Sequence, residues 1–435
     1  MSLRMSPASA IAALRAIAGA ARAWGRDTSG ATALMFAMTA VPLLIGIGAA
    51  IDYTSAATTK TKLDAAVDAA ALLAVGKNEL TKTTAVAQQG ATAIFRAQSA
   101  DIAPATVASF SAQVTENGLV RTAVMKYTAT MPTTFLGVIG MTQIAIAGTA
   151  TASSSLPAYI DFYLLLDNSP SMGVGATTAD INTMVANTSD KCAFACHDLS
   201  DPKNYYKLAK KLNVTMRIDV LRTATQNLMD TADATASISG QFRMSVNTFG
   251  VSCTSLNTPN VVSLTSNMSS AKGQSNNIDL MTIPKQNYNN DQCTDLDGAL
   301  ATMNKLIPAP GDGSTAASPQ KILFFVSDGV ADAYYPTTCT KTTTNGRCQE
   351  PLTAANCKTI RDRGVKIAVL YTTYLPLPTN KWYNDWIAPF QSQIGTNMQA
   401  CASPGLYFEV SPTQGVSEAM TALFQKAVAQ ARLTN

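Results

Sequence analysis

The sequence is poor in charged and ionisable side chains. Only 14% of its 435 residues are Asp, Glu, Lys or Arg, and His197 is its one histidine. This low charge, together with a 47% hydrophobic content, excludes a highly charged disordered chain. The net charge of +4 forms no basic run with interleaved aromatic residues, so we expect no nucleic-acid partner. The length predicts two or three domains.

Cysteine is absent from the first 191 residues. The eight cysteines follow after that point, at Cys192, Cys196, Cys253, Cys293, Cys339, Cys348, Cys357 and Cys401. An even number confined to one part of the chain predicts disulfides formed in an oxidising compartment. The alternative is a set of free core thiols in a cytosolic protein.

Residues 31–51, "ATALMFAMTAVPLLIGIGAAI", contain no charged residue. At a rise of 1.5 Å per residue, a helix of this length crosses the ~30 Å hydrocarbon core of a bilayer. Four arginines precede the stretch and Asp52 follows it, so the positive-inside rule places the N-terminus in the cytoplasm. The alternative is a cleaved signal peptide with small residues at 48–50, although its apolar region would exceed the usual length.

Two different patterns follow the apolar stretch. Residues 52–76 are Ala-rich with helical spacing, which predicts a helix that packs either on its own domain or on a partner helix. Residues 107–153 show strands around the hairpin signal "TENGL". From residue 158, apolar strands alternate with helices, which predicts an α/β domain with a mainly parallel sheet covered on both faces.

Five oxygen-bearing side chains are predicted to meet at one edge of this sheet. Asp167, Ser169 and Ser171 follow the strand "YIDFYLLL", and Asp328 follows the strand 321–327. Thr294 precedes the predicted helix 296–307, which places it at the same edge. Parallel sheets bind ligands at the carboxyl ends of their strands. Carboxylate and hydroxyl oxygens are ligands for Mg²⁺, with Mn²⁺ or Ca²⁺ as alternatives.

Neutral hydroxyls leave the charge of such a cation incompletely neutralised, so a partner's Asp or Glu could complete its shell. The alternative for D-x-S-x-S is a solvated loop closed by an Asx or Ser turn. A Thr before a helix and an Asp-Gly after a second apolar strand, in this order, favour the metal site.

The segments "DNSPSMG", "CTDLDGAL" and "VSDG" resemble the metal-ion-dependent adhesion site of von Willebrand factor A domains. The resemblance covers residues 158–433 and implies a doubly wound α/β fold. It implies metal contact, direct or through water, by Asp167, Ser169, Ser171, Thr294 and Asp328. The chain departs from the pattern in long, cysteine-bearing loops at 174–215, 251–293 and 330–352.

The segment that starts "GRDTSGATALMFAM" and runs to "KLDAAVDAAAL" resembles TadE/TadG-like proteins of Flp (Tad) pilus assembly. "CAFACHD", "MRIDVLR" and "ARLTN" extend the resemblance to the large TadG type that carries an A domain. It implies a cytoplasmic segment 1–30, a transmembrane helix 31–51 and a pilin-like helix and small sheet over 52–155. Prepilins carry Glu five residues after the cleavage Gly, whereas Met35 follows Gly30 at that distance. We therefore expect the anchor to be retained.

Other candidate sites carry weaker signals. His197 with Cys192, Cys196 and Asp198 suggests zinc, but C-x₃-C with one His favours a disulfide. No G-x-S-x-G elbow supports a serine hydrolase. Pairing of neighbours predicts Cys192–Cys196, Cys253–Cys293, Cys339–Cys348 and Cys357–Cys401, of which only the last is favoured by the family resemblance. The segment "NKWYNDWIAPF" is either an exposed binding loop or a packed helix over the sheet.

These patterns and resemblances predict a non-enzymatic scaffold of Flp/Tad pilus assembly, anchored in the bacterial inner membrane by one span. The C-terminal domain is expected to be periplasmic or exported. Expected partners are other Tad pilus-assembly or pilin-like proteins, bound through a metal-bridged carboxylate and through the N-terminal helix. Two alternatives remain: a surface adhesin that uses the same metal, and an exported metal-dependent hydrolase, for which no spare His or Glu is evident by motif.

Overall fold

The computed structural model describes residues 29–193, 200, 204–284, 293–334, 337–344, 346–374, 376–378, 381–411 and 415–433. The chain divides into two compact units. Unit 1 comprises Met1–Thr115 and Thr122–Ser153, and unit 2 comprises Glu116–Arg121 and Ser154–Asn435. Each unit has its own core and is described by itself.

The helices in the described residues are α2 (Ser29–Ala74), α3 (Thr84–Ser99), α4 (Thr178–Asn187), α5 (Tyr205–Lys211), α6 (Arg217–Thr235), α7 (Met268–Gln274), α8 (Leu296–Leu306), α9 (Ala354–Asp362), α10 (Lys381–Trp386), α11 (Gln391–Cys401) and α12 (Val416–Leu433). The strands are β1 (Thr106–Asn117), β2 (Val120–Pro132), β3 (Gln143–Ser155), β4 (Ile160–Leu166), β5 (Phe242–Thr248), β6 (Asn260–Thr265), β7 (Gln320–Ser327), β8 (Val330–Tyr334), β9 (Arg347–Pro351), β10 (Lys366–Thr372) and β11 (Tyr407–Val410).

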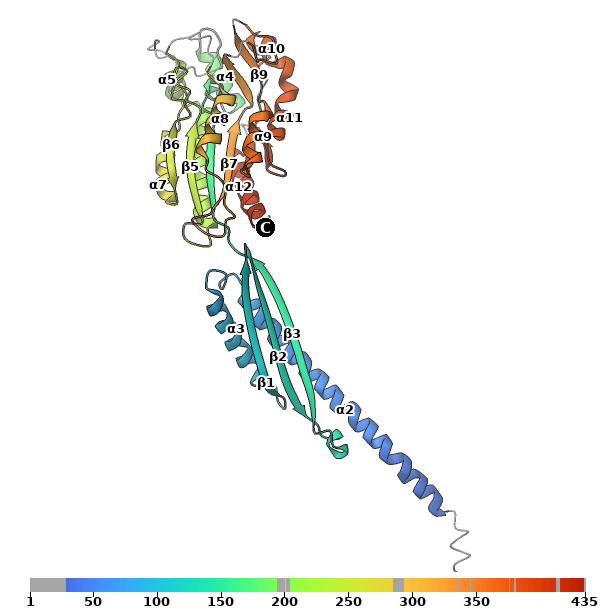
Figure 1. The fold of residues 1–435 in the computed structure, drawn as a ribbon. Coiled ribbons are helices and arrows are strands. Elements are labelled where there is room, and N and C mark those ends of the chain that lie inside the picture. Colours follow the sequence, from blue (N-terminus) through green and yellow to red (C-terminus); the bar gives the residue numbers. More distant parts are fainter. Residues whose placement is uncertain are drawn as a thin grey trace, which may run out of the picture. The chain divides into compact units, whose positions relative to one another are not determined.

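Unit 1 is built on α2, which runs unbroken from the predicted membrane span into the Ala-rich segment. Leu63, Val67 and Ala70 on this helix are buried in one cluster with side chains of α3 and of the three-stranded sheet. Figure 1 shows α2 and α3 lying along that sheet. The helix therefore packs on its own domain, which was one of the two alternatives for this segment.

The sheet of unit 1 has the order β1-β2-β3. The predicted hairpin is present, and Gly118 takes a φ of 56° in its turn, a conformation that favours glycine. The helix α3 was not predicted. Its N-cap is Thr83, whose side chain accepts a hydrogen bond from the amide of Val86, and Phe95 anchors it in the core.

Unit 2 contains a six-stranded sheet of order β11-β10-β7-β4-β5-β6. All neighbouring pairs are parallel except β5 and β6, which are antiparallel. Every residue of the two central strands β4 and β7 is buried, because helices cover both faces. This confirms the prediction of a mainly parallel, doubly covered sheet.

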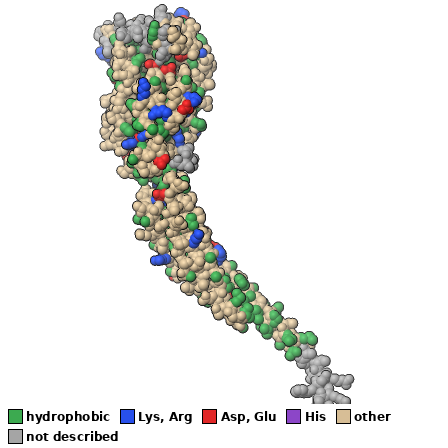
Figure 2. Space-filling view, in the orientation of Figure 1, with side chains coloured by type: hydrophobic (Ala, Val, Ile, Leu, Met, Phe, Trp, Pro, Cys, Tyr) green, Lys and Arg blue, Asp and Glu red, His purple; other side chains and the backbone are tan. Residues whose placement is uncertain are grey.

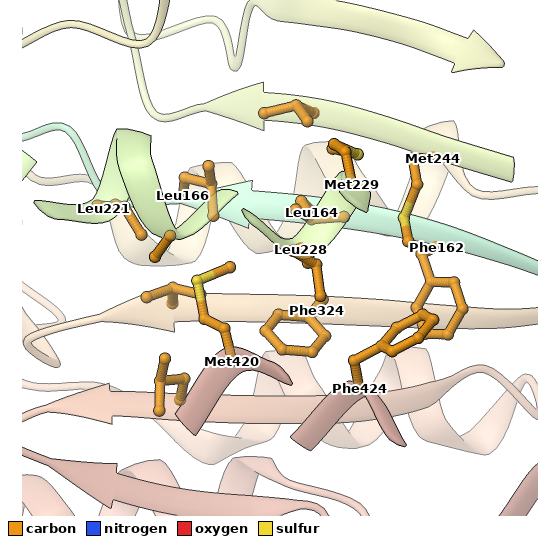
Figure 3. Close-up of a cluster of buried hydrophobic side chains, with 14 of the residues drawn as sticks. Phe162, Leu164, Leu166, Leu221, Leu228, Met229, Met244, Phe324, Met420 and Phe424 are labelled. Atoms are coloured by element: carbon orange, nitrogen blue, oxygen red, sulfur yellow. The ribbon is translucent and has the colours of Figure 1, made fainter. Parts of the chain in front are cut away.

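Alternate side chains of the central strands point into two separate cores. One face packs against α6 and α12, where Phe162 of β4 lies 4.9 Å from Phe424 of α12 between ring centroids. Figure 3 shows side chains of β4, α6 and α12 meeting in this core. The other face packs against α8, α9 and α11. The two cores hold the strand ends in place.

Three of the predicted disulfides form within unit 2: Cys253–Cys293, Cys339–Cys348 and Cys357–Cys401. The predicted fourth pair includes Cys196, which lies outside the described residues, as does His197. The sequence predicted three long loops in this unit. In the structure these regions contain helices and strands of their own. They include α4, α5, β6, α7 and the β8–β9 hairpin. These elements are short, so no sustained hydrophobic period marks them.

The tryptophan-rich segment forms the short helix α10, in which Tyr383 is buried and Trp382 is exposed. The guanidinium carbon of Arg347, on β9, lies 4.4 Å from the ring centroid of Trp382. The segment is thus a helix packed on its neighbours, the second of the two alternatives stated for it.

Candidate metal centre

The register of the central strands brings Asp167 and Asp328 to one edge of the sheet. Leu166 at the end of β4 pairs with Val326 of β7, and the amide of Asp167 donates to the carbonyl of Val326 at 2.9 Å. Asp328 follows β7 directly. Gly329 after it has a φ of 75°, and a Cβ there would lie 2.7 Å from a carbon of Ile394. Only glycine fits this sharp exit from the strand.

The carboxylate of Asp167 is fully buried and held by hydroxyl groups. Oδ1 accepts hydrogen bonds from the amide of Ser169 at 2.9 Å and from its hydroxyl at 2.6 Å. Oδ2 accepts one from the hydroxyl of Ser327 at 2.7 Å. The Ser169 and Ser171 hydroxyls lie 3.0 Å apart. The D-x-S-x-S motif therefore folds into one compact group of oxygens.

Asp328 is also fully buried, but it is less well satisfied. Its Oδ1 accepts from the amide of Val330 at 3.3 Å, whereas its Oδ2 has no hydrogen-bond partner among the described residues. Its ion-pair partner is the buried guanidinium of Arg217, with Nη1 at 3.7 Å from Oδ2. A buried carboxylate oxygen without a hydrogen bond is costly unless another group compensates it.

The electrostatics of the two carboxyl groups reflect this burial. Burial raises the pKa of Asp167, and hydrogen bonds from Ser169 and Ser327 oppose the rise. Burial and the charge of Asp167 raise the pKa of Asp328 to about 7, against the opposing effects of Arg217 and Ser171. Two carboxylates without a sufficient counter-charge therefore share this edge.

Thr294 lies near this group through its backbone. Its amide donates to the carbonyl of Asp332 at 2.9 Å, and its carbonyl accepts from the amide of Asp332 at 3.0 Å. Asp332 belongs to β8, which starts two residues after Asp328. Across the described part of the chain, no hydrogen bond joins the Thr294 hydroxyl to the other four predicted side chains. The structure joins Asp167, Ser169 and Ser171 by hydrogen bonds and brings Asp328 within electrostatic reach of Asp167. It places Thr294 on the segment that pairs with Asp332.

Asn168 shapes the site although it was not predicted to. Its amide nitrogen donates to the carbonyls of Gly250 at 2.8 Å and Asp279 at 3.1 Å. Its oxygen accepts from the amide of Phe249 at 3.1 Å. This buried side chain ties the loop after β4 to the loop after β5, and its only sequence signal was its position beside Asp167.

We expect Asn168→Ala to lower the free energy of unfolding of the protein by about 2 kcal/mol, because it leaves buried backbone groups without partners. Chemical denaturation of the full-length protein measures this loss. Asn187→Ala is the matched control, since the Asn187 side chain is exposed and, among the described residues, donates only to the carbonyl of Thr183 within its own helix. Equal stability of the two variants would contradict the role given to Asn168.

Arg217 was missed because no motif links it to the strand ends. It is the first residue of α6, and its amide donates to the carbonyl of Val174 at 3.0 Å. Its guanidinium carbon lies 5.9 Å from the ring centroid of Tyr374. Burial and the charge of Asp328 raise the pKa of Tyr374, which places this phenol beside the same carboxylates.

A cavity of about 830 Å³ opens beside Tyr374. It lies between β10, β11 and α11, and its lining includes Tyr371, Tyr374, Gln391, Gly395, Tyr407 and Glu409. A Cβ on Gly395 would lie 3.4 Å from the Tyr371 ring and 3.5 Å from the Tyr407 hydroxyl. Tyr374 thus lines a concave, tyrosine-rich surface and also lies against Arg217 of the predicted metal edge.

The chemistry of the oxygen group suits a hard cation. It offers carboxylates and hydroxyls and includes no thiolate or imidazole, which is the donor set of Mg²⁺, Mn²⁺ or Ca²⁺. The buried Oδ2 of Asp328, which has no hydrogen bond among the described residues, is the atom that a cation would satisfy. A second group, Cys339, Cys348 and Glu350, does not fit a metal because the two cysteines form a disulfide.

Comparison with known proteins finds a family match for one part of the chain. Residues 30–88 match the family model of the TadE/G-like Flp pilus-assembly domain, Tad. No curated protein matches the chain.

Among solved structures, the pilus adhesin SpaC of Lactobacillus rhamnosus GG aligns with a TM-score of 0.36 at 11% identity, over 74% of this chain and 34% of that protein. This chain therefore spans about a third of that adhesin. The vWF domain of the type V pili tip protein Mfa5 from Porphyromonas gingivalis aligns with a TM-score of 0.35 at 9% identity, over 64% of this chain and 97% of that domain. A mutant of the PilB minor pilin from Streptococcus sanguinis aligns with a TM-score of 0.33 at 14% identity, over 74% and 78% of the two chains.

Proposed function

We propose that this chain is a non-enzymatic component of Flp (Tad) pilus assembly, anchored in the bacterial inner membrane by residues 31–51. Unit 2 is proposed to be a von Willebrand factor A domain that binds a carboxylate of a partner protein through Mg²⁺ or a similar cation. The partner is another pilus-assembly or pilin-like protein. Residues 1–30 lie in the cytoplasm and unit 2 lies on the far side of the membrane.

The family match and the surface of α2 support the anchor. The match at residues 30–88 covers the apolar stretch and the helix that follows it. Phe36, Val41 and Leu43 within the stretch are each more than half exposed. Figure 2 shows hydrophobic side chains gathered over this end of α2. A charge-free helix with apolar side chains all around suits lipid better than water.

The observation that carries the metal proposal is the buried Oδ2 of Asp328, which has no hydrogen bond within the described residues. It lies in the same buried group as Asp167, whose oxygens are already satisfied by serine hydroxyls. Asp167, Ser169, Ser171 and Asp328 would hold the cation, with Thr294 on the neighbouring segment. When bound, the cation supplies a coordination position that an incoming carboxylate oxygen can take.

Charge counting supports a carboxylate as the group recognised. Two carboxylates and Arg217 leave a net charge of −1 at this edge, and a divalent cation changes it to +1. A carboxylate from the partner restores neutrality in a buried setting, where an unpaired charge is costly. The adjacent tyrosine-lined cavity gives the rest of the partner segment a surface to contact.

We expect Mg²⁺ to raise the thermal unfolding temperature of the full-length protein after chelation, by about 5 °C when the cation is in 100-fold excess over its Kd. Ser169→Ala should lose most of this shift because it removes a proposed ligand. Thermal unfolding in detergent with EDTA, then with Mg²⁺, measures the effect.

Ser314→Ala is the matched control for Ser169→Ala. Ser314 makes the same local contacts with Asp312, from its amide at 2.9 Å and its hydroxyl at 2.8 Å, but it precedes β7 instead of following a strand. It should keep the full response to Mg²⁺. Identical unfolding curves with and without Mg²⁺ in the wild type would refute the metal proposal.

A further inference from the structure

The loop between β2 and β3, residues 133–142, carries no charged residue and exposes large apolar side chains. Val138 is 82% exposed and Ile139 is 51% exposed. Phe135 and Met141 in the same loop are also exposed. Most exposed apolar residues of soluble proteins are scattered singly, so four of them on one short loop indicate an interaction surface.

This β2–β3 loop is fixed to α2 at the end of the predicted membrane span. The carboxylate of Asp52, which is buried, accepts hydrogen bonds from the amides of Thr134 at 3.0 Å, Phe135 at 2.9 Å and Leu136 at 2.8 Å. The Phe135 side chain lies against Gly48, where an added Cβ would come within 2.5 Å of it. The glycine allows the close approach of the loop to the helix.

The contacts of the β2–β3 loop with Gly48 and Asp52 set the depth of the loop relative to the lipid. Gly48 lies inside the charge-free stretch 31–51, and Asp52 is the first charged residue after it. At a rise of 1.5 Å per residue, Gly48 lies about 6 Å along the axis from Asp52, toward the hydrocarbon core. The exposed apolar side chains of the β2–β3 loop therefore lie at the depth where the membrane interface begins.

Most backbone amides of the β2–β3 loop are already satisfied without water. The amides of Thr133, Val138, Gly140 and Met141 each donate to a carbonyl within the loop at 3.1 Å. Together with the three amides held by Asp52, seven amides over residues 133–141 have partners inside the protein. The backbone amides of a loop in water can donate to water, whereas amides that enter lipid need acceptors inside the protein.

We propose that the β2–β3 loop inserts Val138, Ile139 and their neighbours into the interface of the same bilayer that α2 spans. The inference rests on the proposed membrane anchor, and the continuity of the loop with the span identifies lipid as the occupant. Two contacts with the membrane, one spanning and one interfacial, fix the rotation of α2 about its axis. Unit 1 is then presented to other subunits in one orientation.

Photo-crosslinking of the full-length protein tests this insertion. A photoreactive amino acid replaces Val138, and the protein is reconstituted into vesicles of phosphatidylethanolamine and phosphatidylglycerol. Leu43, within the span, is the reference site for lipid contact. Gln113, exposed on β1 near the opposite, hairpin end of the sheet, is the background site. After irradiation, mass spectrometry identifies the adducts.

We expect phospholipid adducts at position 138 in a yield about tenfold above that at position 113, as at position 43. Lipid adducts at 43 with none at 138 would overturn the loop insertion and leave the anchor standing. Adducts at 138 to a second copy of the chain would overturn it in favour of a protein contact. No lipid adduct at 43 would overturn the anchor itself, and the inference with it.

Discussion

The Asp328→Asn variant is expected to be more stable than the wild type in metal-free buffer at pH 8, and to lose the response to Mg²⁺. In the wild type at this pH, two buried carboxylates face one guanidinium, and Asp328 Oδ2 has no hydrogen bond inside the described structure. The substitution leaves Asp167 with Arg217, which is a neutral set. The residue that would bind the cation thus lowers the stability of the metal-free fold.

The pKa of Asp328 sets the size and sign of this effect. In the folded state burial and the charge of Asp167 raise the pKa to about 7 from an ordinary value near 3.8. Between these two values the folded state binds more protons than the unfolded state, so stability falls as the pH rises. Above pH 7 the destabilisation is on the order of 4 kcal/mol, and it disappears as the pH falls toward 4.

Denaturation of wild type and Asp328→Asn at pH 5 and pH 8, with EDTA, measures the difference. The gain in stability of Asp328→Asn over the wild type should be larger at pH 8 than at pH 5. Asp312→Asn is the control of opposite sign, because backbone and side-chain hydrogen bonds from Ser314 lower the pKa of Asp312. That variant should be less stable than the wild type by about the same margin at pH 5 and at pH 8, because the contribution of a carboxyl with a lowered pKa is lost only as the pH falls below its ordinary value near 3.8. A wild type more stable than Asp328→Asn in metal-free buffer at pH 8 would contradict the site.

Asp161→Asn is expected to be the most damaging single substitution at the other end of the sheet. Asp161 is the second residue of the central strand β4 and is buried, and it accepts from Arg243 Nε at 2.6 Å and Nη2 at 2.8 Å. It also pairs with the buried ammonium of Lys321, on the neighbouring strand β7. Removal of its charge leaves Lys321 buried without its counter-charge, at a cost of about 3–5 kcal/mol.

Chemical denaturation of the full-length protein followed by tryptophan fluorescence measures this loss. The double variant Asp161→Asn with Lys321→Met should recover much of it, because no buried charge is then left unpaired. Asp230→Asn is the control, since its pair with Lys272 is exposed and should contribute about 0.5 kcal/mol or less. A loss of the same small size for Asp161→Asn would show that the buried ion pair contributes little.

Much of unit 2 could be predicted from the sequence because its strongest signals are local. The apolar runs of β4 and β7 and the helical spacing of α6 and α12 mark buried elements wherever they fold. Long-range partners leave no such signal. Arg217 lies 50 residues from Asp167 along the chain, so only the packing of α6 against the sheet brings its guanidinium to the carboxylates. The short polar elements α4, α5 and α7 were missed for a related reason, since their helical state depends on capping and tertiary contact.

Two copies of one local motif show which properties can be predicted from the sequence alone and which cannot. Asp167 with Ser169 and Asp312 with Ser314 are both D-x-S, and the local hydrogen bonds are the same in both. Sequence by itself determined that each Asp accepts from the Ser two residues later, because those contacts need only neighbouring residues. It also determined the charge-free stretch 31–51 and the alternation of the main core strands and helices after residue 158.

Only the tertiary structure decided that the pKa values of these two Asp residues shift in opposite directions. The pKa of Asp167 is raised because burial outweighs its hydrogen bonds, whereas the pKa of Asp312 is lowered because the hydrogen bonds from Ser314 act on an exposed carboxylate. Strand register placed Asp328 next to Asp167, and the fold of unit 1 placed the β2–β3 loop against α2. Burial and the proximity of charges depend on chain segments far apart in sequence, so the local motif alone cannot separate a simple turn from the cation site proposed at Asp167.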